Sequence, residues 1–406
     1  MAHQEWLEKQ TTKTIKRLRP ALEDALKQTK NSDEFMQRLE AAFPRLLDLL
    51  LKLYGDRYDF FYYLEKILVN TAQMFADRPA DLRDLDRNHI NNPDWFLSEK
   101  MLGMVCYVDL YAGDIAGLRK KLPFFKEMHI TYLHLMPLFK APETNNDGGY
   151  AISDYRTVNP DLGTMADLAD FARELRENGI SLTLDFVFNH TSNEHEWAQK
   201  AIAGNDTYRD YYHMYPVRTI PEQYEQTLRE IFPAQAPGNF TYYDDIGYWV
   251  WTSFYDFQWD LNYKNPDVFN AMLGEMLFLA NQGVEVLRLD AVAFIWKEMG
   301  TSCENLPQAH MIIQAYNALL KIVAPAMIFK SEAIVHPDDV MSYISQNECA
   351  ISYNPTMMAL IWESLATRSG KLFQYSMSKR YDLPDGCSWV NYVRVHDDIG
   401  WSFADE

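Results

Sequence analysis

The sequence predicts an α/β protein, namely a parallel β/α barrel of the TIM type that follows an all-helical domain. From Met104 onward, short apolar segments alternate with amphipathic helices, which is the pattern of repeated βαβ units. Polar and charged residues directly follow several of these apolar segments. Because the carboxyl ends of the strands meet at one face of a parallel barrel, these polar residues are expected to gather there.

The composition is that of a large, folded and acidic protein. The chain has 406 residues, of which 48% are hydrophobic, and a formal net charge of −19. A chain of this length exceeds a single hydrophobic core, so we expect two or more domains, or one barrel with additions. The negative charge argues against nucleic acid and anionic membrane surfaces as partners, and it favours a neutral or cationic small substrate.

The cysteines and the amino terminus bear on the compartment. The four cysteines are far apart and include no Cys-x-x-Cys pair, so neither a zinc site nor a disulfide framework is expected. The amino terminus lacks the continuous apolar stretch of a signal peptide, and no run of about 18 apolar residues follows it. We therefore expect a cytoplasmic protein, with export by another route as the open alternative.

Residues 1–95 are predicted to form the all-helical domain. Apolar residues recur there at steps of three and four positions, for example at Phe35, Leu39 and Phe43. The segment contains no chemical motif. We expect it to serve packing or oligomerisation, and a homodimer formed through it is one such arrangement.

The first part of the barrel is predicted at residues 96–190. Its expected strands are 104–108, 130–136 and 180–188, with helices at 115–128 and 165–178. A long polar loop, residues 137–163, follows the second strand. Loops of this length above a barrel are usually functional.

The alternation stops over residues 191–262, which are rich in Tyr, Trp, Asp, Pro and Gly. We expect this segment to be a small irregular domain inserted after the third strand. Residues 263–406 then continue the barrel, starting with a helix at Asn265-Pro266, where Asn is a good N-cap and Pro fits the first turn. The remaining strands are predicted at 283–294, 327–331, 349–353 and 389–395.

The fourth predicted strand carries two charges at its carboxyl end. Side chains alternate between the faces of a strand, so Arg288 and Asp290 point the same way. A strand buried on both faces reads as a continuous apolar run, which makes this a costly place for charges. On this pattern alone, a structural ion pair and a catalytic pair remain equally open.

Similar polar residues follow four of the predicted strands. They are Asp185, Asn189 and His190 after the third, Arg288 and Asp290 on the fourth, Glu332 after the fifth, and His396 and Asp397 after the seventh. Each is weak evidence alone, and a lone histidine at either position is more often structural. Their common placement at strand ends predicts one active site at the carboxyl face of the barrel.

These segments resemble the signature regions of the α-amylase superfamily of glycoside hydrolases and transglycosidases. The matching pieces are residues 185–190, 287–292, 330–333 and 395–398. Longer pieces, at 294–297, 300–310 and 331–337, are similar to those of the amylosucrases, a group in this superfamily that builds α-1,4-glucan from sucrose. The resemblance implies a (β/α)8 barrel, so a chain that stops after a seventh strand is expected to be an incomplete barrel and a portion of a longer enzyme.

The resemblance also implies catalytic roles for three carboxyl groups. Retaining enzymes place two carboxyl groups about 5 to 5.5 Å apart, one as the nucleophile and one as the acid and then the base. Asp290 lies beside a cation that favours its ionised form, which suits a nucleophile. Glu332 has no cation adjacent in sequence, which suits the acid/base. Asp397 resembles the third family carboxylate, which binds sugar hydroxyls.

Further residues are implied to bind the substrate. Tyr150 is expected to stack beneath the glucosyl ring, and Asp147 to close the pocket floor with an arginine located beyond Glu406. The full set of implied substrate-binding residues is Asp147, Tyr150, His190, Arg229, Phe254, Arg288, His396 and Asp398. Arg229 and Asp398 are assigned to the fructosyl and acceptor side.

Taken with the chemistry of these residues, the resemblance implies a retaining transglucosylase that cleaves sucrose and transfers glucosyl units to an α-1,4-glucan. A sucrose hydrolase of the same family and a non-catalytic carbohydrate-binding fragment are the alternatives. No cofactor and no metal ion are expected, because the inserted segment shows no carboxylate cage of the kind that binds calcium. The incomplete barrel further predicts poor solubility and little activity of residues 1–406 alone.

Overall fold

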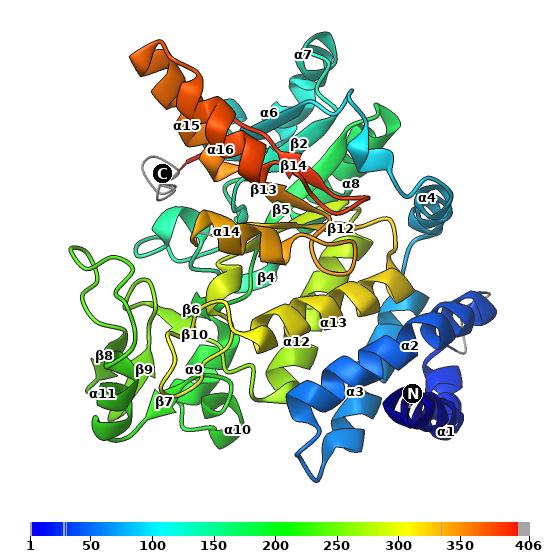
Figure 1. Cartoon of the computed structure of the whole chain (residues 1–406). Helices are drawn as coiled ribbons and strands as arrows, with labels where there is room; N and C mark the ends of the chain where they lie inside the picture. The colour runs from blue at the N-terminus through cyan, green and yellow to red at the C-terminus, as the bar shows by residue number, and fades with distance from the viewer. Residues whose placement is uncertain (1, 27–28, 30, 334, 397–406) are drawn as a thin grey trace.

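The computed structural model describes residues 2–26, 29, 31–333 and 335–396 (Figure 1). Its centre is a parallel sheet of seven strands in the order β1-β2-β5-β11-β12-β13-β14, in which spatial order follows chain order. The strands are β1 (Gly103–Cys106), β2 (Tyr132–Leu135), β5 (Ser181–Val187), β11 (Val286–Asp290), β12 (Ile328–Ser331), β13 (Ile351–Tyr353) and β14 (Ser388–Val390). The predicted series of strands is therefore confirmed, with shorter ends.

The sheet curls into an incomplete barrel. Over the described residues β1 and β14 are its two edges. Both edge strands line a cavity of about 490 Å³, which also reaches Tyr132 of β2 and Lys330 of β12. The barrel described by these residues is therefore open between β1 and β14.

Two predicted strands are too long. The fourth ends at Asp290 because Ala291 adopts a left-handed backbone conformation with φ 52° and the short helix η3 (Val292–Phe294) follows. The seventh, expected to reach Val395, ends at Val390 because its partner β13 offers only three residues for pairing.

The helices around the sheet follow local sequence signals. The helix predicted at 115–128 is divided into α6 (Ile115–Lys120) and α7 (Leu122–Glu127), since Pro123 occupies the first turn of α7, where its missing N–H needs no partner. Helix α8 (Met165–Glu177) begins with a capping box between Thr164 and Asp167. The remaining helices of this part are α5 (Val108–Ala112), α12 (Pro266–Asn281), α13 (Pro307–Val323), α14 (Pro337–Val340), η4 (Met341–Tyr343), α15 (Pro355–Thr367) and α16 (Lys371–Arg380).

The amino-terminal segment is helical, as expected, and packs directly on the barrel. It contains α1 (Ala2–Leu26), α2 (Ser32–Tyr54), α3 (Phe60–Ala76) and α4 (Ala80–Asn91), followed by η1 (Trp95–Leu97). Helix α2 packs against α13 and α3 packs against α12, and Figure 1 shows α2 running beside α13. One continuous hydrophobic cluster joins these helices to the barrel. None of the described helices is long and apolar enough to cross a membrane.

The segment predicted as irregular contains regular structure. Strands β7 (Met214–Tyr215), β9 (Tyr248–Trp251) and β8 (Phe240–Tyr243) form a small antiparallel sheet, flanked by α9 (Glu196–Ile202), α10 (Asp206–Arg209) and α11 (Thr219–Glu225). Figure 1 shows this sheet and α11 in green, on the opposite side of the molecule from α1. The expectation of an irregular segment missed this sheet, in which β8 and β9, both rich in aromatic residues, pair as a hairpin.

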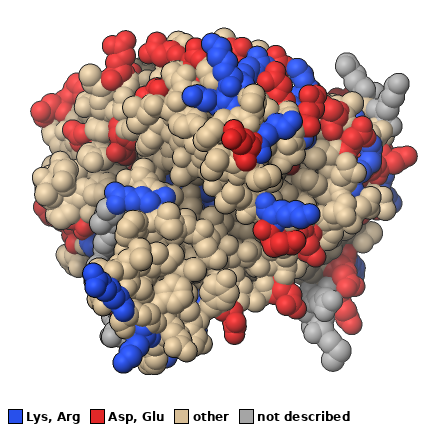
Figure 2. Space-filling view, turned by 90° about the horizontal axis from the view of Figure 1, so that it is seen from above, with Lys and Arg blue, Asp and Glu red and all other residues tan. Residues whose placement is uncertain are grey.

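Two short antiparallel strand pairs lie close to the carboxyl face of the barrel. Strand β6 (His190–Ser192) follows β5 and pairs with β10 (Gln258–Asp260), while β3 (Phe139–Lys140) pairs with β4 (Asp154–Val158) inside the long predicted loop. The same loop contains the short helix η2 (Asp147–Gly149). Acidic and basic side chains are interspersed on the face drawn in Figure 2, which shows no broad basic surface.

Candidate active site

Arg288 of β11 is surrounded by three carboxyl groups. Its Nη1 lies 2.5 Å from Asp185 Oδ1 and 2.7 Å from Asp290 Oδ1, and its Nη2 contacts Glu332. The side chain is 2% exposed. Burial disfavours the charged guanidinium, but the surrounding carboxylates outweigh burial and raise the pKa of Arg288. One fixed positive charge therefore orients three acidic side chains.

The register of the sheet explains this convergence. Arg288 pairs with Asp185 of β5 on one side and with Lys330 of β12 on the other, so the three side chains lie abreast. Alternation then directs Asp290 to the same face as Arg288. The predicted common orientation of Arg288 and Asp290 is confirmed by their hydrogen bond.

Glu332 has a cation beside it in the structure, contrary to the expectation from its sequence neighbours. The sequence offers no cation next to Glu332, but Arg288 on the neighbouring strand contacts it directly. Cross-strand neighbours are separated by 44 positions here and cannot be recognised from adjacent residues. The acid/base role of Glu332 stays a prediction, and it no longer rests on the absence of a cation.

A buried network beneath Arg288 was not predicted. His134 Nε2 lies 2.8 Å from Asp185 Oδ2, and Lys330 Nζ lies 3.3 Å from His134 Nδ1 and 2.9 Å from Tyr353 OH. Burial together with Lys330 lowers the pKa of His134 to about 4, and burial lowers the pKa of Lys330 to about 7. Although burial of Asp185 acts in the opposite direction, Arg288 and His134 hold the pKa of its carboxyl well below the usual range.

A signal for this network exists in the sequence. Lys330 precedes Glu332 by two positions in an apolar strand. His134 is a polar residue flanked by Leu133 and Leu135 in another apolar strand. Alternation places Lys330 on the same face as Glu332. Buried polar residues inside apolar strands are thus additional indicators of the barrel interior.

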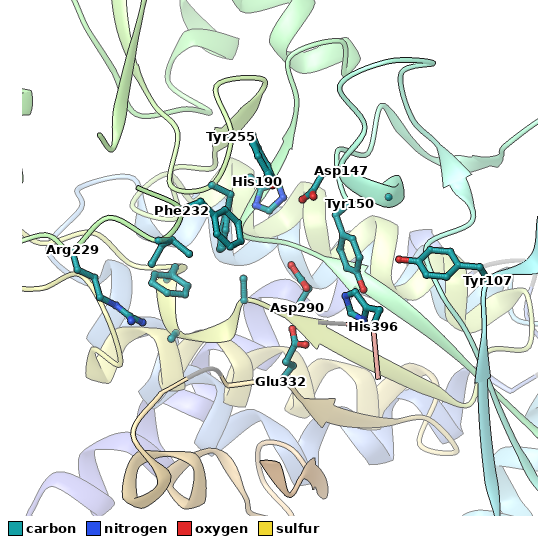
Figure 3. A pocket seen from close by; sticks show the side chains of 16 residues that line it. Tyr107, Asp147, Tyr150, His190, Arg229, Phe232, Tyr255, Asp290, Glu332 and His396 are labelled. Atoms are coloured by element: carbon teal, nitrogen blue, oxygen red, sulfur yellow. The ribbon is translucent and has the colours of Figure 1, made fainter. Parts of the chain in front are cut away.

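Above Arg288 lies a pocket of about 330 Å³ (Figure 3). Eight of the predicted site residues line it, namely Asp147, Tyr150, His190, Arg229, Phe254, Asp290, Glu332 and His396. Figure 3 shows Asp290 and Glu332 with their carboxyl groups near each other at the centre of the pocket. Arg288 supports these two carboxyl groups without lining the pocket, and Asp397 and Asp398 lie outside the described residues.

The pocket has lining residues that the sequence did not single out. They are Tyr107, Gly148, Ile231, Phe232, Tyr255, Ala291, Ala293 and Phe294. Several are aromatic residues from the inserted segment and the loop after β11, whose paths were not predicted. Their aromatic character was the available signal, but it does not distinguish a pocket wall from a core.

Aromatic rings form two walls of the pocket. The Tyr150 ring stacks on His396 at 5.4 Å between centroids, and its hydroxyl accepts a hydrogen bond of 3.3 Å from Arg288. The Phe254 ring lies 5.2 Å from His190 and 5.6 Å from Phe294. Figure 3 shows Tyr150 to one side of the two carboxyl groups, and Phe254 belongs to the wall that contains His190 and Phe294.

His190 lines this pocket. The side chain is 2% exposed, and its Nε2 has no hydrogen-bond partner among the residues that the structure describes. Burial lowers the pKa of His190, which favours the neutral ring. A neutral imidazole whose Nε2 lacks a partner among the described residues is suited to a hydrogen bond with a ligand.

Asp147 is held by a residue of the inserted segment. Gln258 Nε2 donates to Asp147 Oδ2 at 3.0 Å. Strand β10 thus gives Asp147 an amide partner, and the arginine implied by the resemblance stays a prediction. At the opposite rim Arg229 is half exposed and its Nε lies 2.7 Å from Glu304 Oε1.

A second buried charge cluster stabilises the strand pair β6–β10 that carries His190. Lys297 Nζ lies 2.7 Å from Asp260 Oδ2, to which Asn189 and Ser253 also donate. Asp260 pairs directly with His190 between β10 and β6. Within the part of the chain that the structure describes, no group of three or more His, Cys, Asp or Glu side chains is arranged to hold a metal ion.

The fold and the site define the class: a β/α-barrel catalytic domain with an acidic active site at the carboxyl ends of its strands. The chain belongs to the α-amylase superfamily, since residues 73–397 match the family described as alpha amylase, catalytic domain. Its members are glycosidases and transglycosylases, so the chain belongs to a family of enzymes.

Relatives in this family are moderately similar. The chain is 31% identical over 298 residues to trehalose synthase of Pimelobacter sp. (strain R48), covering 71% of this chain and 51% of the relative. It is 32% identical over 289 residues to trehalose synthase of Thermus thermophilus, covering 71% and 29%. A trehalulose synthase mutant crystallised with Tris superposes with a TM-score of 0.57 at 25% identity, covering 64% of this chain and 50% of that one.

The comparisons establish the superfamily, and the narrower resemblance to amylosucrases stays a prediction. The chain spans about half the length of the Pimelobacter relative and less than a third of the Thermus relative. Substrate and product are therefore matters for proposal.

Proposed function

We propose that this chain is the catalytic region of a retaining transglucosylase that cleaves sucrose, releases fructose and transfers the glucosyl unit to an α-1,4-glucan. The observation that carries the proposal is the pair of carboxyl groups of Asp290 and Glu332, both in contact with Arg288 and both lining one pocket. Membership of a glycosidase and transglycosylase family supports this class of reaction.

In the first half-reaction, Glu332 donates a proton to the oxygen between glucose and fructose. A carboxylate oxygen of Asp290 attacks the anomeric carbon, so that the bond to fructose breaks and a glucosyl ester forms. The contact with Arg288 holds the carboxyl group of Asp290 in place for this attack.

In the second half-reaction, Glu332 removes a proton from the acceptor hydroxyl, which attacks the same carbon and releases Asp290. The contact with the guanidinium of Arg288 fixes the position of the Glu332 carboxyl group in both half-reactions. His190 and Tyr150 are suited to hold the glucosyl unit, the first by a hydrogen bond and the second by ring stacking.

Aromatic residues at the rim support a sugar as the acceptor. Phe232 lies 5.4 Å from Tyr255 and 6.1 Å from Phe254, and all three line the pocket. Aromatic faces stack on the apolar faces of sugar rings, so this rim favours an acceptor glucan over water.

A second candidate is transfer within the pocket, by which sucrose is rearranged into another disaccharide. The similarity to trehalose synthases at 31–32% identity and to a trehalulose synthase at 25% supports a disaccharide as the product. A sucrose hydrolase of the same family is the third outcome to be distinguished, and a carbohydrate-binding fragment without turnover is the fourth.

Product analysis on sucrose separates these functions. The proposed function predicts fructose in large excess over free glucose, together with a growing glucan. Equal amounts of glucose and fructose indicate hydrolysis, and a new disaccharide with little free fructose indicates rearrangement. Binding of sucrose with no products at all would reduce the chain to a binding fragment, and Asp290→Asn serves as the inactive control.

A further inference from the structure

Gln258 connects two walls of the pocket through one side chain. It is the first residue of β10, is fully buried, and lies opposite Ser192 of β6. Its Nε2 donates to Asp147 Oδ2 at 3.0 Å, and its Oε1 accepts the backbone N–H of Tyr255 at 3.2 Å. A carboxamide has a donor end and an acceptor end, so these two contacts together fix the orientation of the amide.

The first wall is the turn that carries Asp147. Asp147, Gly148 and Gly149 have φ values of 51°, 64° and 96°, which are left-handed. Such a turn is strained for the non-glycine residue, and its conformation has to be maintained by neighbouring contacts. Asn146 supports the turn by accepting the N–H of Gly148 at 3.1 Å, and Gln258 holds the carboxylate itself.

The second wall is the turn that carries Phe254 and Tyr255. The N–H of Gln258 donates to the carbonyl of Tyr255 at 2.9 Å, so the backbone and the side chain of Gln258 both close this turn. Phe254 and Tyr255 line the pocket on this side. A change at Gln258 therefore acts on both walls at once.

We propose that Gln258 is a positioning residue that sets the direction of the Asp147 carboxylate and thereby the affinity for the glucosyl unit of the substrate. This inference rests on the proposed function and identifies the residue that orders one side of the donor site. A neutral amide donor leaves the negative charge of Asp147 in place. Hydrogen bonds from sugar hydroxyls to a carboxylate are stronger than those to a neutral acceptor, so this arrangement favours binding of a polyhydroxylated ring.

Gln258→Glu gives a specific test because it changes the donor into a second carboxyl group without changing its size. A buried carboxyl group about 3 Å from the half-buried carboxyl group of Asp147 cannot ionise cheaply while Asp147 is ionised, so the pair holds one proton at acid pH and loses it at alkaline pH. At about pH 5 the shared proton restores the contact with Asp147, whereas at about pH 8 the two carboxylates repel each other. A role limited to packing predicts no such pH dependence.

Calorimetric binding of sucrose measures the effect. All proteins carry Asp290→Asn, so that binding is not mixed with turnover. Gln258→Glu is expected to weaken sucrose binding by about tenfold at pH 8 and by much less at pH 5, since about 1.4 kcal/mol corresponds to tenfold. Gln258→Met, which keeps the shape and loses both hydrogen bonds, is expected to weaken binding equally at both pH values. Gln199→Glu on the exposed surface of α9 is the matched control.

The outcomes separate this inference from the proposed function. If the parent with Gln258 does not bind sucrose, the proposed function fails. If the parent binds sucrose and Gln258→Glu binds equally well at both pH values, the positioning role is wrong while the function stands. Should Gln258→Glu fail to fold, Gln258→Met decides the matter, because unchanged affinity in that variant overturns the inference.

Discussion

The ammonium of Lys297 lies 2.7 Å from Asp260 Oδ2, and both side chains are almost completely buried. Lys297→Met leaves the Asp260 carboxylate without its counter-charge, and breaking a buried pair in this way costs about 3–5 kcal/mol. We expect a loss of this order in the free energy of unfolding measured with urea.

Lys264→Met is the matched control for this loss. Lys264 pairs with Glu298 at 3.0 Å, but the two side chains are 41% and 48% exposed. Exposed pairs contribute about 0–1 kcal/mol, so this variant is expected to unfold close to the parent. Similar losses in the two variants would show that the buried pair has no special part in stability.

Glu285 gives the protein a pH-dependent stability. Burial raises the pKa of Glu285 to about 7, although Arg176 and Ser181 act in the opposite direction. In the unfolded chain a glutamate has a pKa of about 4.3. Between about pH 4.3 and about pH 7 the folded state therefore binds a proton that the unfolded state has lost, so stability falls as pH rises through this range. Glu285→Gln removes this titration and keeps an acceptor for Ser181, which donates to Glu285 at 3.3 Å.

The parent should lose about 3 kcal/mol of unfolding free energy from this group between pH 5 and pH 8, and Glu285→Gln should not. The free energy of unfolding of Glu285→Gln relative to the parent should therefore rise by about 3 kcal/mol over this range. Urea unfolding at both pH values measures this gain. Glu298→Gln, at a side chain that is 48% exposed, is the control and should show little change. A difference between Glu285→Gln and the parent that stays constant with pH would contradict the assignment.

Phe254→Ala is expected to weaken substrate binding more than it weakens the fold. Phe254 is half-buried and lines the pocket between His190 and Phe294. Complete truncation of a core phenylalanine costs about 3–5 kcal/mol, and a half-exposed ring costs less. KM for sucrose should rise several-fold while the melting temperature changes little. Phe240→Ala, at a buried ring, is the control for a structural loss. An equal fall in melting temperature for both variants would place Phe254 in the core.

The strands could be predicted because buried parallel strands are apolar runs bounded by polar turns, and the register then brings Asp185, Arg288 and Lys330 abreast. Strand ends were less accurate, since the left-handed backbone at Ala291 has no marker in the sequence. In the site, Asp290 and Glu332 could be predicted as candidate catalytic residues because they lie at strand ends. The contact of Gln258 with Asp147 joins loops 111 positions apart, and no local pattern predicts it.

The proposed roles of Asp290 and Glu332 predict that variants at these two positions differ in how their activity depends on the leaving group of the substrate. Glu332→Gln keeps the size of the side chain and removes the acid, so cleavage of sucrose should fall by about 10²–10⁴-fold. α-Glucosyl fluoride needs little protonation of its leaving group, and its first half-reaction should be largely retained in this variant. Asp290→Asn cannot form the glucosyl ester and should lose turnover of both substrates.

Initial rates of fructose and fluoride release measure these effects. Equal losses on both substrates in Glu332→Gln would exclude it as the acid, and normal sucrose turnover by Asp290→Asn would exclude Asp290 as the nucleophile.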